Sequence, residues 1–434
     1  MQRTSRRQFL QAGSVAAATT LAAGKLFAAD AQSSPNEMIN LGVIGCGARA
    51  GQVLKEFQEL PGNRVTAVCD VNSTHRAKFQ TAFGGPDKVA AYHDFRELIA
   101  DKNVDAVLVA TQAHWHVIPT VLACQAGKDV YVEKPLANSI HEGRIAVEAA
   151  RKYNRIVQIG TQQRSWEHYQ RAVEIIQSGR LGQISEVKIW DLENRFPGFG
   201  SPADCAPPEE LDWDFYVGPA PWRDYNPNCY YNYGYDWFRF SGGGHTVAWG
   251  VHHFDIMQWA MGVKWPKSVV GMGGMHAFGD NREWPDTFTG ILEYGPCPIA
   301  DKGFSVQYTC RMGARREFRA HCKCFFGSEA SLILDRSGYT ITPEPRKGGE
   351  EESFRTPADN AHQAAFLKAV RDRKQPAADV EQGHYSTNAC HLMNISWLAG
   401  RRIEWDGEKE QVVGDPEANA LVDTPYRAPW KLEV

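Results

Sequence analysis

Two short segments of the sequence carry residues that could hold a dinucleotide. Gly45-Cys46-Gly47-Ala48-Arg49 follows an apolar run at 40–44 and precedes a helical pattern. The first glycine permits a tight turn, the second lets the backbone approach a pyrophosphate, and a small residue at Ala50 lets helix and strand pack. The next apolar run ends in Asp70, about twenty residues on, where a carboxylate can accept hydrogen bonds from ribose hydroxyls. This pattern predicts a dinucleotide site that favours NAD over NADP.

A third segment, Glu133-Lys134-Pro135, follows the apolar run 129–132 directly. Ligands of doubly wound sheets bind at the carboxyl ends of strands, so Lys134 can face a nicotinamide ring and exchange a proton with a substrate hydroxyl. Desolvation beside a cationic nicotinamide lowers the pKa of a lysine towards the working pH. The alternative is a solvated loop lysine.

These residues require a parallel sheet to position them. The apolar runs 106–110, 129–132 and 155–159 alternate with helical patterns that begin after Pro119 and after Ile140. Strongly apolar strands alternating with helices predict an α/β fold with a doubly wound Rossmann sheet over residues 38–160, covered on both faces. An α/β domain that binds no nucleotide is the alternative.

The rest of the chain predicts an α+β domain with a large, mostly antiparallel open sheet at 161–355. Its expected strands are 187–191, 268–275, 287–294, 304–311, 317–324 and 330–335. Helical patterns return at 360–371 and 383–398, with Gly400 as a stop signal. We expect residues 356–434 to pack these helices back on the Rossmann domain and to end in an extended arm.

Together the motifs resemble the Gfo/Idh/MocA family, the glucose-fructose oxidoreductase and inositol dehydrogenase group. The likeness rests on Gly45-x-Gly47 and Glu133-Lys134-Pro135, on 111–119 and 160–164, and on Trp249-Gly250-Val251-His252-His253-Phe254-Asp255. It extends over almost the whole chain after residue 37. The tail at 417–430 is similar to that of an exported branch common in polysaccharide-degrading bacteria.

The resemblance implies roles for particular residues. Lys134 and His252 would be catalytic, and Glu133 would contact the nicotinamide ribose. Relatives usually carry an aspartate four residues before this histidine, but the residue here is Ala248, one helical turn away on the same face. The implied cofactor-binding residues are Gly45, Cys46, Gly47, Ala48, Arg49, Asp70, Thr111, His114, Trp115, His116, Glu133, Lys134 and Gln162.

Substrate identity should depend on the middle of the chain. From Trp213 to Phe240, 12 of 28 residues are aromatic, against 11% overall, and rings with polar edges suit sugars. Most of these rings would fix an irregular loop, and two or three would line the pocket. Candidate substrate ligands are Gln163, Arg164, Arg239 and His253, with surface salt bridges or core packing as the alternatives. The histidine pairs lack the convergent third ligand that a metal site needs, so we predict none.

Residues 1–31 are typical of a twin-arginine export signal. Arg6-Arg7 precedes a short, Ala-rich apolar stretch and a small-x-small cleavage site at Ala29-Asp30-Ala31. The stretch is too short to span a bilayer stably. Its removal takes away four basic and one acidic side chain, so the net charge falls from −4 to −7. We therefore expect a periplasmic or otherwise exported protein that meets the twin-arginine translocase and binds no nucleic acid. The ten scattered cysteines favour free buried thiols.

Three function classes fit these observations. The first is an exported NAD-dependent oxidoreductase that acts on a sugar, glycoside or polyol, as a homodimer or homotetramer joined through the open sheet. The second is a glycosidase that oxidises its substrate transiently, but such relatives have replaced the lysine that this chain keeps as Lys134. The third is a non-catalytic sugar-binding protein on the same fold, which an intact Lys134 and His252 disfavour.

Overall fold

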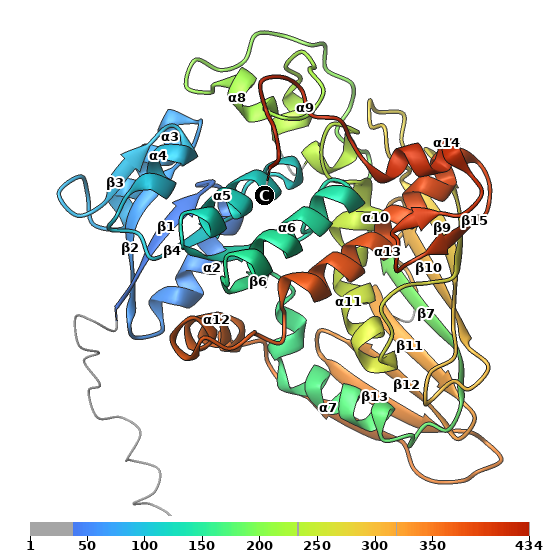
Figure 1. The fold of residues 1–434 in the computed structure, drawn as a ribbon. Helices are drawn as coiled ribbons and strands as arrows, with labels where there is room; N and C mark the ends of the chain where they lie inside the picture. Colours follow the sequence, from blue (N-terminus) through green and yellow to red (C-terminus); the bar gives the residue numbers. More distant parts are fainter. Residues whose placement is uncertain (1–37, 232–233, 318, 434) are drawn as a thin grey trace, which may run out of the picture. The chain divides into compact units, whose positions relative to one another are not determined.

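The computed structural model describes residues 38–231, 234–317 and 319–433, apart from the side chain of Tyr235. The predicted export signal at 1–31 lies outside the described residues. Residues Ile39–Val434 form one compact unit that contains two sheets. One is the parallel sheet and the other the mostly antiparallel sheet that the sequence predicts (Figure 1).

The first sheet has six parallel strands in the order β3-β2-β1-β4-β5-β6. Its strands are buried on both faces, which explains their unbroken apolar sequences. The strands are β1 (Ile39–Ile44), β2 (Asn63–Cys69), β3 (Ala90–Tyr92), β4 (Ala106–Val109), β5 (Asp129–Val132) and β6 (Val157–Ile159). The helices that alternate with them are α2 (Ala48–Gln58), α3 (Ser73–Ala82), α4 (Phe95–Ala100), α5 (Val117–Gln125) and α6 (Ile140–Lys152).

Each face of this sheet has its own apolar core. Helices α4, α5 and α6 cover one face. The other face packs on α2 and on α12 (Ala361–Asp372), where the rings of Phe57, Tyr131 and Phe366 meet edge to face at 5.8–6.1 Å. A helix from the far end of the chain thus completes the apolar core on this face of the first sheet.

The second sheet has ten strands in the order β14-β13-β12-β11-β7-β10-β9-β8-β15-β16. Only β7 and β10 pair in parallel, and the alternate burial along β10 leaves one face against helices and the other open. The strands are β7 (Ile184–Leu192), β8 (Ser268–Gly274), β9 (Thr287–Tyr294), β10 (Phe304–Arg311), β11 (His321–Gly327), β12 (Ala330–Asp335), β13 (Gly338–Pro343), β14 (Glu352–Arg355), β15 (Ile403–Asp406) and β16 (Gln411–Val412).

Helix α13 (Val380–Ala399) connects the two sheets. It lies between α6 and the second sheet and packs on α11 (Gly250–Met261) and β8 (Figure 1). Gly400, at φ +69°, ends it in the left-handed conformation, as the sequence predicts. The other helices of this part are α7 (Glu167–Gln177), α8 (Trp213–Val217), α9 (Pro227–Tyr230), α10 (Gly244–Ala248) and α14 (Pro416–Asn419), with 3₁₀ helices η2 (Ala113–Trp115), η3 (Gln162–Ser165), η4 (Gly234–Trp237) and η5 (Ala420–Val422).

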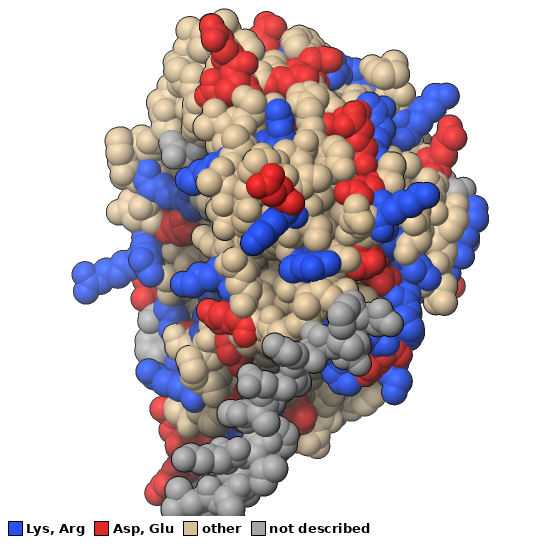
Figure 2. Space-filling model, turned by 90° about the vertical axis from the view of Figure 1, so that its left-hand side faces the viewer, with Lys and Arg blue, Asp and Glu red and all other residues tan. Residues whose placement is uncertain are grey.

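The C-terminal arm returns to the first sheet. The Trp430 ring meets that of Trp115 edge to face at 4.7 Å, and Arg427 pairs with Asp214 of α8 at 2.6 Å. On the face shown in Figure 2, basic and acidic side chains are interspersed. No helix within the described ranges has the length and apolarity to span a membrane. All ten cysteines are free, and eight are buried.

Candidate active site

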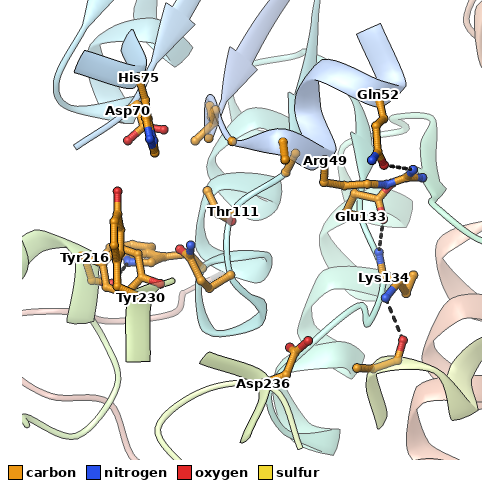
Figure 3. Close-up of a pocket in the computed structure, with 18 of the residues that line it drawn as sticks. Arg49, Gln52, Asp70, His75, Thr111, Glu133, Lys134, Tyr216, Tyr230 and Asp236 are labelled. Carbon is orange, nitrogen blue, oxygen red and sulfur yellow. Dashed lines mark hydrogen bonds and ion pairs between the residues drawn. The ribbon is translucent and has the colours of Figure 1, made fainter. Parts of the chain in front are cut away.

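A cavity of about 680 Å³ lies at the carboxyl ends of the first sheet. Its lining combines turns that follow β1, β2, β4 and β5 with residues of η4, α10 and α11. Figure 3 shows Asp70 and His75 at one end and Lys134 and Asp236 at the other. The same cavity therefore holds the expected nucleotide and proton-transfer residues.

The turn after β1 leaves room for a phosphate group. Gly45 has φ +89°, and a Cβ there would lie 2.8 Å from the Ala110 carbonyl oxygen, so the tight turn requires glycine. A Cβ on Gly47 would meet nothing within 4 Å. Helix α2 begins there without a side-chain cap or an acidic residue in its first turn, which leaves its N–H groups free for an anion. These features fit a dinucleotide pyrophosphate.

Asp70 is fixed by the backbone around it. The Cys46 N–H donates to its Oδ2 at 2.6 Å, and the Asn72 N–H donates to its Oδ1 at 2.7 Å. Burial raises its pKa, although both hydrogen bonds act in the opposite direction. Each carboxylate oxygen keeps a further acceptor position, so Asp70 can still receive ribose hydroxyls.

Glu133 is held by a cation and by close packing. Arg49 donates from Nε to Glu133 Oε1 at 2.8 Å, and a Cβ on Gly160 would approach the carboxylate to 2.8 Å. Burial acts to raise the pKa of Glu133, but Arg49 outweighs it and the pKa is lowered. With its amide reoriented, Gln162 accepts from Arg49 at 2.8 Å. Glu133 is therefore ionised and immobile beside the cavity.

Lys134 reaches across the cavity to the second domain. Its Nζ donates to the Ala248 carbonyl oxygen at 2.7 Å. Burial lowers its pKa, while Asp236 and Glu133 oppose the shift. The position at which relatives carry an aspartate thus supplies only a backbone acceptor to this lysine.

Asp236 supplies a carboxylate at the same end of the cavity (Figure 3). It comes from η4, inside the aromatic stretch, and a Cβ on Gly242 would lie 3.1 Å from its Oδ1. Burial raises its pKa to about 6, although Lys134 acts to lower it. Sequence reasoning missed this residue because nothing in the local pattern places it beside Lys134.

Two histidines, His245 of α10 and His252 of α11, also line the cavity. Burial lowers the pKa of His252 well below its usual value, and Lys134 lowers it further, so the ring is neutral rather than a titrating partner at neutral pH. The His245 Nε2 lies 2.7 Å from Oδ2 of the fully buried Asp191, whose other oxygen contacts His321. Burial acts to raise the Asp191 pKa, but the histidines hold it below its usual range.

Most predicted cofactor residues line the cavity, and three do not. Gly45, Gly47, Ala48, Arg49, Asp70, Thr111, Trp115, Glu133, Lys134 and Gln162 line it. Cys46 is buried behind the turn and contributes its backbone N–H to Asp70. The buried rings of His114 and His116 contact the carbonyl oxygens of Tyr216 at 2.9 Å and Pro135 at 2.5 Å. These two rings fix the surrounding loops instead.

The four predicted substrate ligands do not line this cavity. Arg164 is buried against Asp255, with both carboxylate oxygens 2.8 Å from its Nε. Gln163 accepts from Lys323 at 3.1 Å, and His253 faces a separate void of about 10 Å³. The exposed Arg239 stacks on two tryptophans. The polar residues that line the cavity instead include Arg195, Asp236, His245 and Arg336.

Both ends of the chain match models of one protein family. Residues 39–161 match the Gfo/Idh/MocA model for the oxidoreductase family, NAD-binding Rossmann fold. Residues 350–432 match the model for the C-terminal alpha/beta domain of the same family. The segment between them, which includes the aromatic stretch and most of the second sheet, lies outside both matches.

Among curated proteins, the chain is similar to an inositol 2-dehydrogenase/D-chiro-inositol 3-dehydrogenase of Shouchella clausii. The two are 34% identical over 147 residues, which is 33% of this chain and 42% of the relative. It is also 33% identical over 155 residues to a glycosyl hydrolase family 109 protein of Solibacter usitatus, covering 33% of this chain and 35% of that protein. The matched part of the chain thus spans less than half the length of either relative.

The likeness in fold extends further than the likeness in sequence. The aldose-aldose oxidoreductase from Caulobacter crescentus superposes with a TM-score of 0.64 at 18% identity, covering 85% of this chain and 99% of that one. Both domains of the present structure therefore have counterparts in a solved structure. Residues 39–161 and 350–432 thus match the two domain models of the Gfo/Idh/MocA oxidoreductase family in order.

Proposed function

We propose that this protein transfers a hydride between the hydroxyl-bearing carbon of a sugar, glycoside or polyol and NAD. The observation that carries the proposal is the cavity that joins Gly45 and Asp70 to the half-buried Lys134. The inositol dehydrogenase relative and the aldose-aldose oxidoreductase fold support a polyhydroxylated substrate. The test is formation of NADH at 340 nm from a panel of sugars, glycosides and polyols.

The residues present fit NAD, which supplies a hydride acceptor at this site. The turn at Gly45–Gly47 and the start of α2 would hold the pyrophosphate, and Asp70 would receive the adenosine ribose hydroxyls. Asp70 would also repel a 2′-phosphate, so we expect NAD to be preferred over NADP. Glu133, kept ionised by Arg49, would bind the second ribose.

The proton-transfer step falls to Lys134. Oxidation of a carbinol requires the hydroxyl proton to leave with the hydride, and Nζ of Lys134 can accept it when neutral. Burial lowers its pKa towards that state. His252, neutral in its buried position, can hydrogen-bond the substrate hydroxyl through a ring nitrogen and orient it towards Lys134.

A glycosidase reaction is the second candidate, favoured by the 33% identical glycosyl hydrolase family 109 relative. In that reaction a ring hydroxyl is oxidised, the glycosidic bond is eliminated, and the hydride returns. A glycoside panel with catalytic NAD distinguishes the two. Sugar release without net NADH would establish the glycosidase, and stoichiometric NADH would establish the oxidoreductase. The absence of both products would favour a binding protein.

Export through the twin-arginine route would constrain how NAD is held. The space outside the cytoplasm maintains no NAD pool, so we propose that the chain folds around NAD and carries it out. A residence time of hours implies a Kd on the order of nanomolar or below. Protein isolated from the periplasm should release about one NAD(H) per chain on denaturation. Empty protein with a Kd near 0.1 mM, by rough estimate, would contradict this closed cycle.

Assembly through the open sheet is also proposed. The exposed Met272 and Ile291 lie on the adjacent strands β8 and β9, on the face away from the helices. Covering such side chains in a homodimer or homotetramer would remove apolar surface from water. Light scattering of the wild type and of the Met272→Lys, Ile291→Lys double variant would test this, because charged residues should dissociate the assembly.

A further inference from the structure

One cation at the edge of the cavity, Arg336, takes part in no ion pair that the described residues form. Arg336 follows β12 at the turn into β13, and its guanidinium carbon lies 4.8 Å from the ring centroid of Trp249. No ion pair joins it to an acidic side chain in the part of the chain that the structure describes. Its neighbour Asp335 pairs with Arg319 at 2.8 Å instead.

Arg336 is exposed at the edge of the cavity, where a bound anion can reach it, and other cations lie near it. Burial lowers the pKa of His252, and the charges of Lys134 and Arg336 lower it further. Arg336 also adds to the burial that lowers the pKa of Lys134, so the two cations repel one another. An anion bound at Arg336 would offset that repulsion. The other arginine at this end, Arg195, already contacts Glu193.

The position of Arg336 is supported by a stack of rings. Trp249 lies nearly parallel to His321, with centroids 5.2 Å apart, and stacks on His245 at 6.0 Å. The buried Asp191 contacts both histidines and holds them in place. A planar guanidinium on this support presents two parallel N–H donors, the geometry that matches a carboxylate.

We propose that Arg336 binds a carboxylate carried by the substrate, so that the enzyme acts on acidic sugars such as hexuronates. This rests on the proposed function and names its substrate class. With the carboxylate held at Arg336, Lys134 and His252 would act on the hydroxyl to be oxidised.

The test compares matched pairs that differ in one carboxylate: glucose with glucuronate, galactose with galacturonate, and mannose with mannuronate. Glucose 6-phosphate is added to separate a carboxylate from a phosphate. Each compound is measured for NADH formation and, by calorimetry, for binding to the NAD-loaded protein. The variants are Arg336→Met, Arg336→Lys and the control Arg180→Met, which removes an exposed arginine paired with Glu352 outside the cavity.

We expect the wild type to prefer a hexuronate over its neutral partner on the order of 10- to 100-fold in kcat/KM. Arg336→Met should abolish the preference, mainly through KM, Arg336→Lys should retain part of it, and Arg180→Met should keep it. Equal use or equal binding of both members in every pair, a preference that survives in Arg336→Met, or tighter binding of glucose 6-phosphate would each overturn the assignment.

Calorimetry keeps this proposal separate from hydride transfer. Arg336-dependent uronate binding without NADH from any sugar would support the carboxylate site and refute the proposed oxidoreductase. NADH formed equally from neutral sugars and uronates would support the oxidoreductase and refute the carboxylate site. Binding of no compound in the panel would overturn the carboxylate site as well.

Discussion

The two ends of the cavity are assembled in different ways. At the nucleotide end, Gly45, Asp70 and Glu133 each follow a strand of one parallel sheet, so short motifs place them together. At the other end, Asp236 comes from a 3₁₀ helix and Arg336 from a strand turn of the second sheet. The first end is a property of local sequence, and the second depends on how distant segments pack. Chemistry common to the family should therefore depend on the first, and substrate choice on the second.

The largest effect should come from the residue at which the two ends meet. Lys134→Ala should lower kcat at least about 10²-fold, the lower range for a proton-transfer group, while NAD binding stays largely intact. Fluorescence titration with NAD and single-turnover kinetics would separate the two quantities. Lys152→Ala, at an exposed position in the last turn of α6, is the control. Comparable turnover in Lys134→Ala would remove this lysine from the mechanism.

A second variant tests whether Asp70, at the nucleotide end, sets the preference for NAD over NADP. Asp70→Asn keeps an oxygen that can accept a hydrogen bond but removes the negative charge, so NADP should be rejected less strongly. The preference for NAD should fall by on the order of 2 kcal/mol, or roughly thirtyfold. Asp105→Asn is a matched control, because that carboxylate also accepts a backbone N–H, from Asn40, at another strand end. A wild type that binds NADP more tightly than NAD would refute the assignment.

The same contrast explains how much could be predicted from the sequence. The parallel sheet and six of the ten strands of the second sheet follow from apolar runs and alternation, and both sheets are confirmed. Strands β3, β13, β14, β15 and β16 were missed; four of them have four residues or fewer, and so short a run shows no alternation. Arg164 and His253 were expected near substrate, but their side chains face Asp255 and a separate void. Which polar side chain lines a cavity depends on packing between elements, and one sequence does not contain that information in local form.

Two neighbouring glycines test the nucleotide end at finer scale. Gly45→Ala should destabilise the fold by about 2 kcal/mol, because a Cβ at φ +89° also meets the Ala110 carbonyl. Gly47→Ala should leave the free energy of unfolding of the nucleotide-free protein unchanged, because a Cβ there meets no atom. It should instead raise the Kd for NAD about tenfold by obstructing the pyrophosphate. Denaturant unfolding and NAD titration of both variants test these expectations. Equal changes in the free energy of unfolding and in the Kd for NAD in the two variants would contradict them.

The smallest effect concerns Asp236, at the end of the cavity that forms where distant segments pack together. The pKa of Asp236 is raised to about 6, so the carboxylate is ionised above that pH and protonated below it. As the pH falls through 6, Asp236 becomes neutral. Lys134 gains its proton as the pH falls through its own lowered pKa, and the rate of sugar oxidation, which needs the neutral amine, should fall. Asp236→Asn removes the titration of the Asp236 carboxylate. It also lowers the Lys134 pKa further, because a neutral amide does not stabilise the ammonium.

The acidic limb of the kcat profile should therefore move to lower pH in Asp236→Asn. On the alkaline plateau, where the lysine is neutral in both proteins, kcat should fall by about threefold to tenfold because an amine of lower pKa is a weaker base. Asp224→Asn makes the same chemical change at an exposed position of the same aromatic stretch and should leave the profile unchanged. A limb that stays in place, or moves to higher pH, would show that Asp236 does not act on Lys134. The carboxylate missing at position 248 would then have no substitute in η4.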